Sequence, residues 1–150
     1  RSPINSIRDF ISQPILNHTS EENMEIWVRE NTPEDSIFII PPQQIEKMRT
    51  HGRRAVVVEW KSTTSLSSDL REWYNRILDV SGFPRETHPK TISGELLLNG
   101  YHNLDIARAK YLQKLYRADY VVVLNEHKGD ISNLIMRYEN DEYKVLEIPR

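Results

Sequence analysis

The hydrophobic residues of this chain fall into two kinds of pattern, short unbroken apolar runs and longer stretches with helical spacing. Unbroken runs occupy residues 37–40 and 120–124, and a third apolar run, residues 55–60, is interrupted only by Glu59. A run that is apolar at every position is typical of a strand covered on both faces, and it favours a central parallel strand. About a dozen residues separate the first two runs, close to the minimum for a parallel crossover. The pattern therefore predicts three parallel strands.

Helical spacing appears before the first strand and between the later ones. Thr19 followed by Glu22 is the sequence of a capping box, and Pro33 ends the helix that begins there. The apolar stripe of this helix consists of Met24, Trp27 and Val28. A short helix is expected over residues 43–49, with the chain turning at His51 and Gly52.

Two further helices are predicted between the second and third strands. The clearer one starts at a cap on Ser67 or Ser68 and ends at Gly82. Its inward positions are Leu70, Trp73, Tyr74, Ile77 and Leu78. The other is capped by Asn103 and runs to Arg117. Its inward positions are Ile106, Ala109, Leu112, Leu115 and Tyr116.

The chain closes on two alternating stretches, residues 134–138 and 143–148, joined by the turn-rich residues 139–142. They predict an antiparallel hairpin at a sheet edge. Together the elements predict an α/β fold, a three-layer Rossmann-like sandwich with a mostly parallel sheet. We expect the strand order second, first, third, with the hairpin outermost.

The domain organisation follows from the same pattern. Residues 1–18 are predicted to be an N-terminal extension, and residues 19–150 a single domain, as the length of 150 residues suggests. Residues 83–102 keep no sustained period and are predicted to be an irregular excursion, with a brief helical turn at most. Because the chain begins with Arg1 rather than methionine, we expect it to be a fragment or a processed product.

Composition excludes several classes of function. The net charge is −2 with both signs mixed along the chain, so no nucleic-acid partner is expected. There is no cysteine, which excludes disulfides, thiolate metal sites and cysteine nucleophiles. The apolar runs are far shorter than the roughly 20 residues that span a bilayer. The five histidines show no metal-ligand spacing, so no metal site is expected.

The predicted site lies at the carboxyl ends of the parallel strands, where open α/β sheets bind ligands. Candidate ligand-binding residues follow each strand: Gln43, Gln44, Glu59, Lys61, Glu126 and His127, flanked by Ser62, Thr63, Asn125 and Lys128. An acid, an amine and an imidazole would meet there. The alternative is that these loop ends are polar only because they are hydrated.

No cofactor is expected at this site. Pro41 and Pro42 follow the first strand, and prolines lack the amide hydrogens that would hold a phosphate. The G-x-S-x-G elbow of common serine hydrolases is also absent. Arg53 and Arg54 could bind an anion or an acidic partner, although turn arginines are usually just hydrated.

Three segments carry a resemblance to a known group of proteins: "EIWVRENTPEDSIFIIPP", "RRAVVVEWKS" and "LREWYNRI". With the later "ADYVVV" and the closing hairpin, they resemble an uncharacterised bacterial domain that forms the soluble C-terminal part of polytopic membrane proteins. The chain is also similar to the extracytoplasmic α/β domains of membrane glycosyltransferases that use lipid-linked sugars. The resemblance covers residues 20–82 and 103–148. It implies no catalytic residue here, because that chemistry belongs to membrane-embedded loops.

Three functions are consistent with these observations. The first is a non-catalytic accessory domain that binds a ligand or partner outside the cytoplasmic membrane, with the membrane-embedded remainder of the same chain as a partner. The second is a small soluble enzyme that uses Glu59, Lys61 and His127 at the strand ends. The third is a protein–protein interaction module that docks through residues 83–102.

Overall fold

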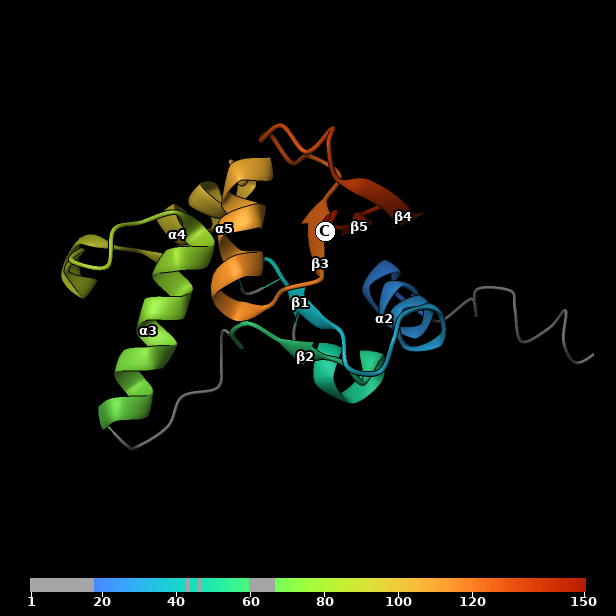
Figure 1. Cartoon of the computed structure of the whole chain (residues 1–150), viewed down its shortest axis with the longest axis horizontal. Helices are drawn as coiled ribbons and strands as arrows, with labels where there is room; N and C mark the ends of the chain where they lie inside the picture. Colours follow the sequence, from blue (N-terminus) through green and yellow to red (C-terminus); the bar gives the residue numbers. More distant parts are fainter. Residues whose placement is uncertain (1–17, 43, 46, 60–66) are drawn as a thin grey trace, which may run out of the picture.

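The structure is a computed structural model, and it describes residues 18–42, 44–45, 47–59 and 67–150. Its centre is one mixed five-stranded sheet with the order β2-β1-β3-β5-β4 (Figure 1). The strands are β1 (Ile37–Ile39), β2 (Ala55–Val56), β3 (Tyr120–Leu124), β4 (Ile135–Glu139) and β5 (Tyr143–Glu147). β1 pairs in parallel with both β2 and β3, whereas β3, β5 and β4 pair antiparallel. The predicted strand order and the closing hairpin are confirmed.

One face of the sheet is covered by helix α2 (Ser20–Asn31) and by the π-helical turn η1 (Met48–Gly52). The capping box of α2 is present as predicted, because the Glu22 amide donates to Thr19 Oγ1 at 3.1 Å and the Thr19 amide donates to Glu22 Oε1 at 3.3 Å. Met24 and Val28 of α2 are fully buried against Phe38 of β1 and its neighbours. Trp27 stacks on Tyr138 of β4, with 5.1 Å between the ring centroids.

The opposite face packs against α3 (Ser67–Ser81), α4 (Gly94–His102) and α5 (Ile106–Tyr116), which lie together on the other side of the sheet from α2 (Figure 1). Alternation along the strands divides the apolar side chains between the two faces. In β3, for example, Val121 and Val123 belong to this cluster, whereas Val122 packs on the α2 side. The continuous apolar run of this strand is therefore explained by burial on both faces.

Several sequence-based boundaries were wrong. Among the described residues of the segment 43–49, only Met48 and Arg49 are helical, and they belong to η1. β2 contains only two residues, and α5 is capped by Asp105, whose side chain accepts from the Arg108 amide, rather than by Asn103. Leu70 and Leu115 were expected to face inward, but their exposed fractions are 44% and 43%. Each lies on a helix whose other apolar residues already fill the contact with the core.

The segment predicted to be irregular, residues 83–102, holds the short 3₁₀ helix η2 (Pro89–Thr91) and the nine-residue helix α4. Ser93 caps α4 through its side chain, which accepts from the Leu96 amide at 3.2 Å. The predicted extension, residues 1–18, lies outside the described residues except for His18. The expected caps of α3, the side chains of Ser67 and Ser68, also lie outside them.

Among the described residues, no helix combines the length and the apolar character that a bilayer crossing requires.

Candidate functional site

The topology places the switch in strand order between β1 and β3. The chain leaves β1 towards β2 on one side, and β3 later enters on the other side. In open parallel sheets this is the point where a crevice opens beyond the carboxyl ends of the strands, and where ligands commonly bind. The sequence-based site was predicted at this edge of the sheet.

A tyrosine from α4 occupies this point. The Tyr101 side chain is fully buried, and its hydroxyl donates to the Val122 carbonyl at 2.6 Å and lies 3.2 Å from the Ile39 carbonyl. These two carbonyls belong to the neighbouring strands β3 and β1. Burial raises the pKa of Tyr101 well above its ordinary value. The phenol is therefore a neutral hydrogen-bond donor that joins α4 to the end of β1 and the middle of β3.

Close backbone approaches hold α4 in this position. A Cβ atom at Gly100 would lie 2.2 Å from the Ser81 carbonyl oxygen, so a residue with a side chain could not pack here against the end of α3. Gly129, in the β3–β4 loop, approaches the α4–α5 connection equally closely, because its Cβ would lie 2.0 Å from the Leu104 carbonyl oxygen. The Lys128 and Gly129 amides both donate to the His102 carbonyl, at 2.9 and 2.8 Å. The loop thus closes over the end of α4.

His127 is part of this closure. Its Nε2 lies 2.8 Å from the Leu104 carbonyl oxygen, and its ring meets the Tyr101 ring edge-on, with centroids 6.4 Å apart. Burial lowers the pKa of His127, and the hydrogen bond to Leu104 acts in the opposite direction. A neutral imidazole that donates Nε2–H to a carbonyl fits these contacts. The predicted imidazole is therefore at the strand ends, where it packs against Tyr101 and Leu104.

The other predicted residues have separate positions. The Gln44 carbonyl accepts from the Tyr143 hydroxyl at 3.2 Å. Glu59 Oε1 lies 3.4 Å from Arg49 Nε, and its carbonyl accepts from Trp73 Nε1 at 2.7 Å. Glu126 is exposed to solvent. Gln43, Lys61, Ser62 and Thr63 lie outside the described residues. Glu59 thus contacts Arg49 and Trp73, whereas His127 contacts Leu104 and Tyr101.

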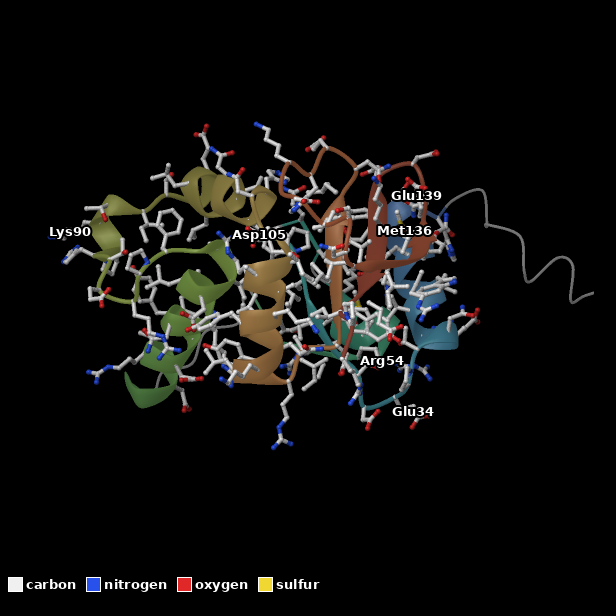
Figure 2. All side chains as sticks on the ribbon, turned by 45° about the horizontal axis from the view of Figure 1, so that its top comes forward. Glu34, Arg54, Lys90, Asp105, Met136 and Glu139 are labelled. Carbon is white, nitrogen blue, oxygen red and sulfur yellow. The ribbon has the colours of Figure 1, made fainter. Side chains whose placement is uncertain are left out.

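Arg54 is a candidate anion-binding residue in the sequence, but its guanidinium forms hydrogen bonds with the end of α2. The guanidinium donates from Nη2 to the Arg29 and Thr32 carbonyls, at 2.8 and 2.6 Å, and from Nε to Thr32 Oγ1 at 3.0 Å. Carbonyls at the end of a helix carry partial negative charge, which suits a cation. This explains how a guanidinium with an exposed fraction of 5% is tolerated. Figure 2 shows Arg54 and Glu34 at this end of α2, away from Glu139.

A second polar cluster, which the sequence did not suggest, lies between α3 and α5. Arg85 donates to both carboxylate oxygens of Asp79, from Nε at 3.2 Å and from Nη2 at 2.7 Å. The Tyr116 hydroxyl donates to Asp79 Oδ2 as well. Burial and then the bond to Asp79 raise the pKa of Tyr116. The Arg76 guanidinium lies 4.7 Å from the centroid of the Tyr116 ring, in cation–π geometry. Asp79 is buried, and these donors compensate the negative charge of its carboxylate.

A third cluster lies where α2 meets η1. Glu25 is fully buried, and Oε1 lies 3.4 Å from His51 Nδ1. Burial first, and then the negative charge of Glu21, raises the pKa of Glu25 to about 8. A sequence signal existed for this position, because residue 25 lies beside Met24 and one helical turn before Val28. It therefore falls at the border of the apolar stripe.

An open pocket of about 650 Å³ lies at the opposite end of the central strands, near the amino ends of β1 and β3. Its polar lining includes Asp119, which accepts from the Ile37 amide at 3.0 Å and lies 3.6 Å from Arg150 Nη2. Asp119 thus supports the start of β1. No group of three or more potential metal ligands is present among the described residues.

Comparison with known proteins gives one family. Residues 19–80 match the family model described as a domain of unknown function (DUF6798). The match covers less than half of the chain and spans α2 to α3, so it includes Glu25, His51 and Arg54 but not Tyr101 or His127. No curated protein matches the chain.

Proposed function

We propose that this chain is a non-catalytic accessory domain of a bacterial membrane protein. It lies on the extracytoplasmic side of the membrane and binds a ligand or a partner, including the membrane-embedded remainder of the same chain. The proposal rests on the resemblance of residues 20–82 and 103–148 to soluble domains of polytopic membrane proteins and membrane glycosyltransferases.

The observation that carries the non-catalytic part is the position of Tyr101. In a parallel α/β sheet the substrate commonly enters at the switch point, but here that point holds a buried phenol bonded to the Val122 carbonyl. The nearby imidazole of His127 is likewise bonded to a carbonyl. A switch point occupied by Tyr101 supports a domain that uses its outer surface rather than an internal site.

We also propose that the fold is a three-layer, Rossmann-like sandwich. Helix α2 on one face and helices α3 to α5 on the other support three layers. The parallel pairs of β1 with β2 and β3 support the Rossmann-like character, and the antiparallel hairpin is then an addition at one edge.

Cell fractionation tests the proposed location. An antibody against residues 19–150 should detect the parent protein in the membrane fraction of the native bacterium. Protease added to spheroplasts should remove the epitope, and protease added to inverted membrane vesicles should not. Recovery of the epitope in the soluble cytoplasmic fraction, or digestion in inverted vesicles alone, would contradict the proposal.

A substitution series tests the absence of catalysis. In any assay in which deletion of the domain from the parent protein causes a loss, Glu59→Gln and His127→Gln should retain the wild-type rate constant. If either variant loses at least a hundredfold in kcat while its unfolding midpoint stays unchanged, the enzyme alternative replaces the accessory domain.

A further inference from the structure

The contact between α2 and η1 contains a carboxyl group with unusual surroundings. Glu25 is fully buried in the middle of α2, where acidic side chains are rarely found without a cation or several hydrogen-bond donors. Its carboxyl lies beside that of Glu21 and the Lys47 amide, but neither oxygen forms a hydrogen bond of ordinary geometry with a described residue. A negative charge at this position would therefore be poorly compensated.

The element that covers Glu25 is a π-helical turn. π-Helical segments are rare and often occur at functional sites. In η1, the His51 and Gly52 amides both donate to the Lys47 carbonyl, at 2.8 and 3.4 Å, and the turn ends at Arg53 with a φ of 55°. At its end, the Arg53 amide donates to the Met48 carbonyl, and the Arg54 amide lies 3.4 Å from the same oxygen. Such a turn can leave its position without breaking a strand or a long helix.

The packing between the two elements is tight. Met48 is buried, with an exposed fraction of 2%, and a Cβ at Gly52 would lie 2.6 Å from Met48 Sδ and 3.7 Å from the Glu25 carbonyl oxygen. Both carboxyl oxygens of Glu25 are also buried from solvent while η1 stays in place. Hydration of an ionised Glu25 would require η1 to move.

We propose that Glu25 and η1 form a proton-controlled latch. With the Glu25 carboxyl protonated and neutral, η1 packs against α2. Loss of that proton places a negative charge inside the contact, and η1 moves away so that water reaches the carboxylate.

The charged and titratable groups around Glu25 favour this direction. On α2 itself, Glu21 and Glu22 both oppose a second negative charge. From β5, Tyr143 faces the same cluster, and burial together with the charges of Glu21, Glu142 and Glu25 raises its pKa to about 12. β4 contributes the uncharged Tyr138, which stacks on Trp27.

His51 on η1 lies beside the carboxyl and can carry a compensating positive charge. Its Nδ1 lies 3.4 Å from Glu25 Oε1, and its side chain is partly exposed. A protonated His51 would offset an ionised Glu25, whereas a neutral imidazole would not. The latch therefore opens on loss of the Glu25 proton, which is the alkaline side of the transition.

The sign of the pH dependence follows from the pKa of Glu25, about 8 against an ordinary value of 4.5. Because the folded protein keeps this proton to a higher pH than the unfolded chain does, the stability that depends on the Glu25 proton is fully present below pH 4.5. It decreases as the pH rises to 8. The folding equilibrium constant should fall about tenfold for each pH unit within that window, the effect of one proton.

Hydrogen exchange at different pH values tests the latch directly. In the wild type, the opening constants of the His51 and Arg54 amides, corrected for intrinsic exchange, should rise at least tenfold between pH 6 and pH 8, inside the window set by the two pKa values of Glu25. Amides of α5, such as that of Ala109, should follow only the change in global stability. In Glu25→Gln the rise at η1 should disappear. Glu30→Gln, an exposed change on the same helix, should behave as the wild type.

Two results would overturn the proposal. One is a rise at η1 that persists in Glu25→Gln. The other is a pH-dependent loss of global stability without any local opening of η1, which would make Glu25 a merely destabilising buried acid. Because Glu25→Gln could fail to fold, the carboxyl carbon of Glu25 should also be titrated by NMR in the wild type. A midpoint near pH 8 is expected, and a midpoint between 4 and 5 would exclude the latch.

Discussion

Two buried carboxyl groups lie on opposite sides of the sheet and have very different hydrogen-bond partners and neighbouring charges. Asp79, near the end of α3, accepts two hydrogen bonds from Arg85 and one from Tyr116. Glu25, in the middle of α2, faces another glutamate and a histidine across η1. Their exposed fractions are 7% and 0%, so burial alone does not separate them.

The difference lies in the donors that each environment supplies. The Asp79 carboxylate meets a planar guanidinium in a two-point contact, the geometry in which arginine binds carboxylates best. Glu25 receives no such donor, and burial raises its pKa to about 8. The comparison suggests that the Asp79 cluster fixes α3, the following loop and α5 together, whereas the Glu25 cluster leaves a contact that a single proton can weaken.

Replacement of each acid by leucine should give opposite results, and this is the largest effect that we expect. At pH 9, Asp79→Leu should lower the free energy of unfolding by about 3 kcal/mol, because Arg85 and Tyr116 lose their acceptor. Glu25→Leu should raise it by about 2 kcal/mol, since an apolar side chain of similar volume replaces a poorly compensated charge. Urea denaturation measures both. Effects of the same sign would remove the distinction between the two sites.

Much of the fold was predictable because a strand that is buried on both faces has a continuous apolar sequence. The runs "IFII" and "YVVVL" gave β1 and β3, and turn residues between alternating stretches gave the β4–β5 hairpin. α4 was missed because its sequence, Gly94 to His102, contains two glycines and only a short apolar run. Its position depends on tertiary contacts, above all those of Tyr101 and Gly100, and spacing along the chain does not reveal such contacts.

The candidate site was less predictable than the fold. Sequence places polar residues after each strand, but it does not show that Tyr101, from a helix elsewhere in the chain, bonds to the carbonyls of β1 and β3. Likewise, the guanidinium of Arg85 reaches Asp79 across a turn, and Arg54 reaches Thr32 over 22 positions. Which residues form these pairs depends on the path of the folded backbone, so no local sequence pattern predicts them.

Arg54 extends the comparison to a buried positive charge. Arg54→Met should lower the free energy of unfolding by about 3 kcal/mol, because the Arg29 and Thr32 carbonyls at the end of α2 lose their donor. Arg53→Met is the matched control, since Arg53 is exposed, and it should change the value by less than about 0.5 kcal/mol. Equal losses in the two variants, measured by urea denaturation, would show that the contacts of Arg54 contribute little.

Arg85→Met should make Asp79 resemble Glu25. The carboxylate would keep Tyr116 but lose its cation, and we expect the free energy of unfolding to fall by about 2 kcal/mol. The loss is smaller than for a fully buried pair, because nearly half of the Arg85 side chain is exposed to solvent. Arg71→Met, an exposed change on α3, serves as the control in calorimetric unfolding. A loss no larger than in the control would mean that Tyr116 alone suffices for Asp79.

The smallest expected effect separates the hydroxyl of Tyr116 from its ring. Tyr116→Phe removes the donor to Asp79 but keeps the ring beneath the Arg76 guanidinium, so the free energy of unfolding should fall by about 1 kcal/mol. Tyr111→Phe on the same helix is the control, because 51% of Tyr111 is exposed and its hydroxyl can remain hydrated. If both changes cost the same, the Tyr116 hydroxyl adds nothing to the pairing of Asp79. The contrast with Glu25 would then depend on Arg85 alone.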